Sequence, residues 1–307
     1  MRPLQGIALK VGSVLVFIVM SSLIKTTTAD IPAGEAVFFR SFFALPVIVA
    51  WLAMRRELAT GLQAHNPISH IWRGLMGTLA MGLGFAGLGF LPLPEVTAIG
   101  YASPLLVVVF AAMFLGEEVR LFRISAVALG LTGVMIVLSP RLTVVSGDVA
   151  SQREALGAML VLAGAFCSAL AQVFVRKLVN TEKTAAIVFY FSLTSTVLSL
   201  TTLPFGWAMP NAWQFATLVL AGLLGGVGQI LLTSSYRGTD ASLIAPFDYA
   251  SMIFALAIGY FAFAEVPTLT MLGGAGLVIF AGILIIWRER KLGIERNKGR
   301  KAMTPQG

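Results

Sequence analysis

The sequence predicts an all-α integral membrane protein, with ten transmembrane helices arranged as two inverted five-helix repeats. Of its 307 residues, 57% are hydrophobic and 12% are charged, whereas soluble domains carry roughly 25% charged residues. The apolar residues gather in ten long runs, and a short motif in one half of the chain returns in the other half. These three observations exclude an ordinary soluble domain.

Each run is long enough to cross a membrane as a helix. A bilayer core of about 30 Å needs about 20 apolar residues, because lipid offers the backbone no hydrogen-bond partners. The first run also resembles a secretory signal, but the nine further runs favour a retained helix. We expect spans near 6–24, 36–54, 72–91, 96–115, 124–139, 156–175, 185–203, 213–233, 241–262 and 268–287.

The repeated motif indicates how the spans are organised. Gly100-Tyr101-Ala102-Ser103 and Asp248-Tyr249-Ala250-Ser251 each precede a glutamate, Glu117 or Glu265, by the same interval. Five spans per half is an odd number, so the halves must enter the membrane with opposite polarity. Inverted repeats recur in secondary transporters, whose substrate sites lie near mid-bilayer. We expect a first repeat at 1–139, an extracytoplasmic linker at 140–153, a second repeat at 154–287 and a basic cytoplasmic tail at 288–307.

The basic residues predict the orientation, because Lys and Arg in short loops stay cytoplasmic. With the N-terminus inside, 18 of the 22 fall on the cytoplasmic side, and the C-terminus is cytoplasmic as well. The net charge of +8 then reflects topology and attraction to anionic lipid, without a nucleic-acid partner. The cytoplasmic set is Arg2, Lys10, Arg55, Arg56, Arg73, Arg120, Arg123, Arg176, Lys177, Lys183, Arg237 and the seven basic residues of the tail, whereas Lys25, Arg141 and Arg153 fall outside.

Several motifs together resemble the EamA type of the drug/metabolite transporter superfamily, over nearly the whole chain. This resemblance implies ten helices, cytoplasmic termini and a central cavity that opens alternately to each side. One departure is Ala264, which replaces the glycine expected before the second glutamate. The motifs are Phe38-Phe39-Arg40-Ser41-Phe42-Phe43-Ala44, Tyr101-Ala102-Ser103-Pro104 and Gly116-Glu117 in the first half, and Asp248-Tyr249-Ala250-Ser251, Glu265-Val266-Pro267 and Trp287-Arg288-Glu289-Arg290 in the second.

Two charged residues inside predicted spans are candidate substrate contacts, because intramembrane charges are costly and mark functional sites. Arg40 lies among phenylalanines in the second span and could meet a carboxylate or an anionic substrate; a structural ion pair or snorkelling is the alternative. Asp248 stands where the first half has Gly100 and could carry a proton or pair with Arg40 or a substrate amine. Solvation near the cytoplasmic mouth is the alternative for Asp248.

Tyrosines and neighbouring polar residues complete the candidate site. Tyr101 and Tyr249 should approach each other near the midplane, where their rings could stack on a planar solute and their hydroxyls orient it. Hydrogen bonding between helices is the other role open to the polar members. The candidate substrate contacts are Arg40, Tyr101, Ser103, Gln172, Gln229, Asp248, Tyr249 and Ser251.

Other polar residues and prolines are expected to serve the framework. Glu95, Glu117, Glu118 and Glu265 lie at helix ends, where capping and solvation explain them. Pro104 and Pro246 fall inside predicted spans and should kink them where a cavity needs room.

No catalytic, metal or cofactor site is expected. The sequence has no phosphate-binding Gly-x-x-x-x-Gly-Lys-[Ser/Thr] loop and no Gly-x-Ser-x-Gly elbow. Its two histidines, His65 and His70, lack zinc-site spacing, and the single Cys167 can form no internal disulfide.

We therefore expect a secondary active transporter of a small organic metabolite in the cytoplasmic (inner) membrane of a bacterial-type cell. The substrate expected first is a flat, partly aromatic solute such as riboflavin or S-adenosylmethionine, with export of amino acids or their analogues as the alternative. A passive channel and an integral-membrane enzyme acting on lipid-like substrates are the alternatives of other classes. The lipid bilayer and the solute are the expected partners, and a homodimer stays open.

Overall fold

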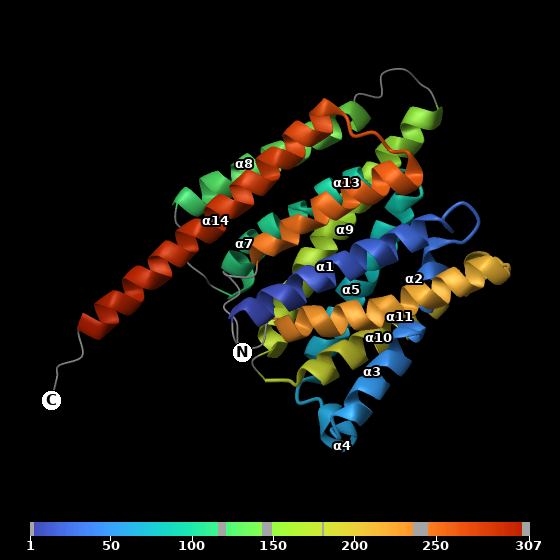
Figure 1. Ribbon diagram of the computed structural model, residues 1–307, viewed down its shortest axis with the longest axis horizontal. Coiled ribbons are helices and arrows are strands. Elements are labelled where there is room, and N and C mark those ends of the chain that lie inside the picture. The colour runs from blue at the N-terminus through green and yellow to red at the C-terminus, as the bar shows by residue number, and fades with distance from the viewer. Residues whose placement is uncertain (1–2, 116–120, 143–148, 180, 236–244, 303–307) are drawn as a thin grey trace.

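The computed structural model describes residues 3–115, 121–142, 149–179, 181–235 and 245–302, and every regular element within these ranges is helical (Figure 1). Two 3-10 turns, η1 (Leu203–Phe205) and η2 (Ala245–Tyr249), accompany the α-helices. The α-helices are α1 (Pro3–Lys25), α2 (Ala33–Phe42), α3 (Ala44–Met54), α4 (Leu58–Gly61), α5 (Pro67–Leu88), α6 (Leu93–Gly100), α7 (Ala102–Leu115), α8 (Leu121–Leu142), α9 (Val149–Val179), α10 (Thr184–Leu200), α11 (Ala212–Ser235), α13 (Ala250–Phe263) and α14 (Leu269–Ala302).

The predicted membrane fold is confirmed. Within the described ranges, nine helical segments are long and apolar enough to cross a bilayer, and α10 is a shorter apolar helix of 17 residues. The start of α1 and the end of α14 lie at the same end of the bundle, on the left of Figure 1. We call this the terminal end and the opposite one, where Lys25 and Glu265 lie, the distal end.

Helix packing relates the two halves to each other. Helix α1 packs against α11, and α9, which corresponds to α1, packs against α5, which corresponds to α11. Likewise α1 contacts α13 and α9 contacts α7, which corresponds to α13, whereas α2 pairs with α10 and α8 with α14. Exchanging the halves therefore maps these contacts onto one another, as an inverted repeat requires.

Three spans are broken near their middle or start. Helix α2 gives way to α3 at Phe43, α6 to α7 at Tyr101, and η2 to α13 at Tyr249. Pro46 and Pro104 each follow their break by three residues. A proline clashes with the carbonyl four residues before it, and these carbonyls belong to the last residues of α2 and α6, so the helices break there. The expected distortion at Pro246 is the 3-10 turn η2.

The third span starts earlier than the hydrophobic run, which suggested position 72. Helix α5 begins at Pro67, because the Asn66 side chain accepts a hydrogen bond from the Ser69 N–H at 3.1 Å and proline suits the first helical position. Arg73 consequently lies almost two turns inside the helix instead of at its end.

Helices also extend into the segments expected to be linker and tail. Helix α8 continues to Leu142 and α9 begins at Val149, so the described parts of 140–153 are helical. Helix α14 runs on through most of 288–307, as Lys, Arg and Glu favour helix once the apolar run ends.

A buried carboxylate joins two segments at the terminal end. Glu182, just before α10, accepts hydrogen bonds from the backbone N–H groups of His65 at 2.7 Å and Asn66 at 2.8 Å. Burial alone would raise the pKa of this carboxyl, but the two N–H donors and the nearby His65 and His70 rings hold its pKa below the usual value. Glu182 therefore fixes the start of α5 beside the start of α10.

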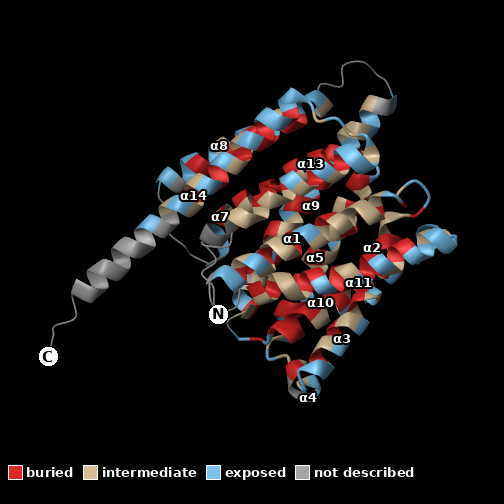
Figure 2. Ribbon diagram, viewed as in Figure 1, coloured by how far each residue is buried: buried red, intermediate tan, exposed pale blue. Residues whose placement is uncertain are grey.

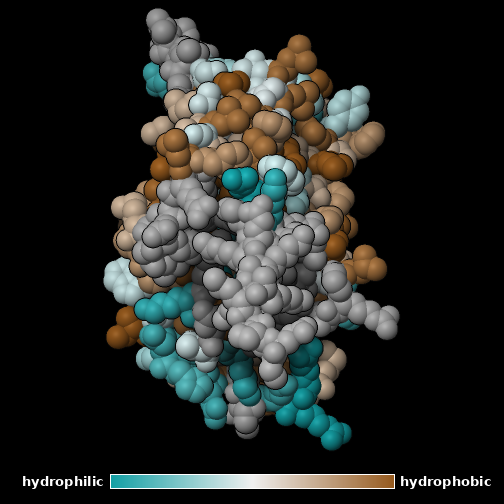
Figure 3. Space-filling model, turned by 90° about the vertical axis from the view of Figure 1, so that its left-hand side faces the viewer, coloured by the Kyte–Doolittle hydropathy of each residue, from teal (hydrophilic) through white to brown (hydrophobic). Residues whose placement is uncertain are grey.

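The outer surface is that of a protein in lipid. Exposed residues follow the outward faces of α8 and α14, and buried residues line the seam between them (Figure 2). On the terminal end, hydrophilic side chains gather in the lower part of the face, while its upper part is mostly hydrophobic (Figure 3).

The seam between α8 and α14 depends on two glycines. A Cβ added at Gly274 would lie 2.7 Å from the Gly133 carbonyl oxygen, and one added at Gly133 would lie 2.8 Å from that of Gly274. Backbone cannot give way as a flexible side chain can, so the two helices cross closely only without side chains here.

Gly274→Ala should lower the free energy of unfolding by about 1–3 kcal/mol, because the added methyl forces the helices apart. Gly273→Ala is the matched control: a Cβ there has no neighbour within 4 Å, and alanine favours helix. Thermal unfolding of the purified variants in detergent checks this pair. Equal stability of the two variants would contradict the seam described here.

Candidate functional site

A cavity of about 540 Å³ lies between the two halves. Its wall is built from α1, α2, α5, α6, α7, α9, α10, α11, η2 and α13, so both repeats contribute. On α1, α9 and α11, most of its lining residues lie in the first half of α1 and in the second halves of α9 and α11. These portions lie toward the terminal end (Figure 1), so this part of the cavity wall is on that side of the bundle.

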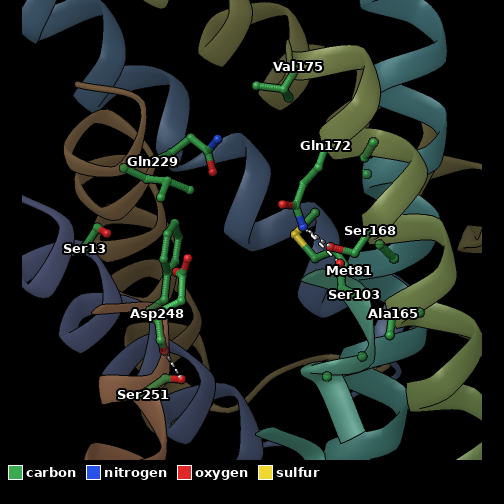
Figure 4. A pocket seen from close by; sticks show the side chains of 18 of the residues that line it. Ser13, Met81, Ser103, Ala165, Ser168, Gln172, Val175, Gln229, Asp248 and Ser251 are labelled. Carbon is green, nitrogen blue, oxygen red and sulfur yellow. Dashed lines mark hydrogen bonds between the residues drawn. The ribbon is translucent and has the colours of Figure 1, made fainter. Parts of the chain in front are cut away.

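Seven of the eight candidate residues predicted from the sequence line this cavity; Tyr249 does not. In Figure 4, Gln229, Asp248 and Ser251 lie along one wall, and Ser103 and Gln172 lie along the facing wall. The Gln172 amide donates to the Ser103 hydroxyl at 2.9 Å, so this pair also connects α9 to α7. Their contact with a substrate stays a prediction.

The two repeat tyrosines lie together but in different surroundings. Their ring centroids are 5.0 Å apart with an interplanar angle of 72°. The Tyr101 hydroxyl lies 2.6 Å from the Ser251 hydroxyl and donates to the Tyr249 carbonyl oxygen at 3.3 Å. The Tyr249 hydroxyl instead points at Gly282 of α14, where a Cβ would collide with it. Tyr101 can therefore meet a solute, whereas Tyr249 fills the packing between η2 and α14.

Asp248 forms an ion pair with a lysine of the first half. Its Oδ1 lies 2.6 Å from Nζ of Lys10, which is 1% exposed, whereas the Asp248 side chain is 38% exposed. The pair joins η2 to α1 on the cavity wall. From the sequence, Lys10 was counted among the charges on the cytoplasmic side, although position 10 falls within the predicted span 6–24. Its place inside that span was the available signal that Lys10 is a charge within the membrane.

Arg40 has a neighbouring arginine that the sequence interpretation missed. The Arg73 guanidinium carbon lies 3.6 Å from the centroid of the Phe191 ring, and that of Arg40 lies 5.4 Å from it. Both arginines are buried and line the cavity. An arginine at the centre of a span costs about 2.5–3.5 kcal/mol on insertion scales, so two beside one ring are a specific feature. Arg73 was missed because the predicted span placed it at a helix end.

Polar contacts join the two halves at the distal end. Lys25 forms an ion pair with Glu265 at 2.8 Å and donates to the Leu91 carbonyl at 2.6 Å. Glu265 also accepts from the Leu93 N–H at 2.9 Å. These contacts tie the end of α1 to the loops before α6 and before α14. Glu265 is therefore part of a latch between halves as well as a helix-end residue.

A second cluster of acids and bases lies at the distal end. Arg141 binds Glu95 through two hydrogen bonds of 2.7 and 3.0 Å and also contacts Glu154. Glu117 and Glu118 lie outside the described residues. No group of three His, Cys, Asp or Glu side chains that could hold a metal occurs in the part of the chain that the structure describes.

The charges on the cavity wall are unbalanced. Three cations, Lys10, Arg40 and Arg73, face one carboxylate, Asp248, among the described lining residues. Serines, glutamines and Tyr101 add neutral hydrogen-bonding groups. This wall can bind a polar solute with several orienting contacts, and its size falls within the range of about 300–1,000 Å³ typical of small-molecule sites.

The fold and the cavity define a multi-pass helical membrane protein with a solute-sized site between two inverted halves. The model of the EamA-like transporter family matches residues 4–139 and 155–288. The chain belongs to this family, within the drug/metabolite transporter superfamily. A solved crystal structure shares the fold with a TM-score of 0.66 and 19% identity, covering 94% of this chain and 98% of the other.

Curated relatives are similar over most of the chain. The pseudopaline exporter of Pseudomonas aeruginosa is 27% identical over 92% of this chain and 95% of its own length. The S-adenosylmethionine uptake transporter of Rickettsia bellii is 26% identical over 92% and 97%. A riboflavin transporter of Rhizobium johnstonii is 28% identical over 85% and 83%. Family and relatives indicate a transporter of small metabolites rather than an enzyme.

The different surroundings of the two tyrosines can be tested with isosteric changes. Tyr101→Phe should lower the free energy of unfolding by about 1 kcal/mol, because it removes the hydroxyl contacts to Ser251 and the Tyr249 carbonyl. Tyr249→Phe is the matched control, since its hydroxyl makes no hydrogen bond within the described residues. Thermal unfolding checks both, and a Tyr249→Phe loss as large as that of Tyr101→Phe would be the contrary result.

Proposed function

We propose that this protein is a secondary active transporter that moves a small organic metabolite across a bacterial cytoplasmic membrane by alternating access. The observation that carries the proposal is the cavity, which both halves line, together with the Lys25–Glu265 latch that joins the halves at the distal end. Breaking that latch while the halves close at the other end would expose the same wall residues to the opposite side. A latch between the halves at one end also argues against a passive channel.

The orientation follows from the charges. Lys and Arg gather in the segments that reach the terminal end, so this end is cytoplasmic under the positive-inside rule. We therefore assign this conformation to an inward-facing state, with both termini inside the cell. Association into a homodimer stays a prediction.

The cavity wall favours a charged solute over a neutral aromatic one. Stacking between the two tyrosines is not supported, because Tyr249 is packed against α14. S-adenosylmethionine carries a carboxylate and two cationic groups, which could meet the arginines and Asp248, whereas riboflavin is neutral. We therefore put an S-adenosylmethionine-like solute first, with riboflavin and amino acids or their analogues as the alternatives.

Asp248 is the proposed coupling residue. Its side chain is partly exposed to the cavity and forms an ion pair with Lys10, so protonation would weaken a contact between η2 and α1. A solute or a proton that weakens the Asp248–Lys10 ion pair therefore affects how η2 is held against α1, and both of these elements line the cavity. Such a link is what coupling requires, because only a differential interaction can shift a conformational equilibrium.

The experiment is exchange and accumulation of radiolabelled S-adenosylmethionine, riboflavin and amino acids in proteoliposomes. We expect one class to exchange with saturation and to accumulate when a pH gradient is imposed. Asp248→Asn should retain exchange and lose at least about tenfold of the gradient-driven accumulation, since it removes the titratable group.

Asp30→Asn is the matched control, because Asp30 is exposed at the distal end and contacts Gln214 outside the cavity. Gradient-driven accumulation by Asp248→Asn at the wild-type rate would overturn the coupling role. Uptake of all solutes without saturation would overturn the transporter and indicate a pore.

A further inference from the structure

We infer that the transported solute carries a carboxylate or phosphate group, and that Arg40 and Arg73 together bind this oxyanion. The inference rests on the proposed function, because it assigns a substrate class to the cavity of that transporter. It starts from a contrast between these two arginines and the other cations of the membrane-spanning part.

The two arginines are buried without an anionic partner among the described residues. Their exposed fractions are 3% for Arg40 and 7% for Arg73. Nε and Nη1 of both side chains have no hydrogen-bond acceptor, and neither residue has a carboxylate within 4.0 Å, in the part of the chain that the structure describes. Buried guanidinium groups normally have their N–H donors satisfied, so these donors point to a partner that is not a side chain of this bundle.

Other cations in the spans are treated differently. Lys10 pairs with Asp248, Lys25 with Glu265, and Arg141 with Glu95. Each of these pairs joins elements of the framework. The described carboxylates therefore pair with cations that hold the framework together, and none of them pairs with Arg40 or Arg73.

The surroundings hold the two guanidinium groups in place. Both lie over Phe191 of α10, which binds a cation through its ring face and leaves the N–H donors at the guanidinium edge available. Two glycines make room for them: a Cβ at Gly77 would collide with Nη1 of Arg73, and one at Gly225 would lie 3.0 Å from Nε of Arg40. Four helices, α2, α5, α10 and α11, thus shape this subsite.

The chemistry of the subsite selects the ligand class. A guanidinium presents N–H donors in a planar fork that matches two oxygens of a carboxylate or phosphate. A neutral ring or sugar hydroxyl can accept one such bond but leaves the like charges of the two arginines uncompensated. The described cavity wall also carries more cations than carboxylates, which favours a solute with an anionic group.

The test compares matched ligands on the full-length protein purified in detergent without added lipid. The pairs are S-adenosylmethionine with decarboxylated S-adenosylmethionine, which lacks the carboxylate, and adenosine 5′-monophosphate with adenosine, which lacks the phosphate. A ligand that binds the folded state raises the unfolding temperature. We expect the member that carries the carboxylate or phosphate to raise the unfolding temperature and the member without that group to leave it unchanged; the pair that responds separates carboxylate from phosphate.

The variants are Arg40→Gln and Arg73→Gln. Each should weaken anion binding by about 30-fold or more, as expected when one partner of a buried charge contact is truncated. Arg55→Gln is the matched control, because Arg55 also lies over an aromatic ring, 4.7 Å from the Trp51 centroid, but is exposed and outside the cavity. Without ligand, Arg40→Gln and Arg73→Gln should unfold at no lower temperature than the unchanged protein, because each removes a buried charge that has no anionic partner among the described residues.

Several results would overturn the inference. They are equal stabilisation by both members of each pair, no stabilisation by either member that carries a carboxylate or phosphate, unchanged anion binding in the two glutamine variants, or a marked drop in their ligand-free unfolding temperature. Saturable exchange of a neutral solute by Arg40→Gln in the proteoliposome assay would overturn the anion subsite while leaving the transporter intact. Absence of exchange for every solute would instead count against the proposed function itself.

Discussion

Charges inside a hydrocarbon layer must find their partners within the protein, and this constraint organises the whole molecule. Lipid supplies no hydrogen bonds, so a charged side chain in a span is either paired, turned toward water or held for a ligand. In this chain the paired charges, Lys10–Asp248 and Lys25–Glu265, connect elements from different halves. The arginines beside Phe191 are the exception, and they lie where the halves leave a cavity.

The same constraint explains why the helices break where they do. Backbone that leaves the regular helical pattern is tolerated in a membrane only where protein or a polar cavity surrounds it. The breaks at Tyr101 and Tyr249 meet each other, and the hydroxyl of Tyr101 satisfies the Tyr249 carbonyl. The interruption therefore supplies its own hydrogen bond and brings Ser251 and Asp248 to the wall of the cavity. The ion pairs at the distal end and the cavity toward the terminal end together give the asymmetry that an alternating-access cycle would reverse.

Much of the fold could be predicted from hydrophobic runs and one repeated motif, because membrane spans are governed by composition over about 20 residues. The meeting of Tyr101 and Tyr249 also followed from the repeat. The direction in which each ring points did not follow from the repeat, because it depends on Gly282, which belongs to a helix distant in sequence. Arg40 and Asp248 were recognisable as charges deep in apolar runs. Arg73 was not, because its depth depends on where α5 begins, and Asn66 and Pro67 set that start by local capping that hydropathy does not report.

The most direct test of alternating access is the accessibility of a cavity residue from each side of the membrane. Ser168 lines the cavity, and Ser168→Cys in a Cys167→Ser background places a single thiol there. In oriented proteoliposomes, a membrane-impermeant maleimide should label this thiol from the terminal side without solute, and from the distal side as well while solute is being exchanged. Labelling from the same single side under both conditions, or from both sides regardless of solute, would contradict the account.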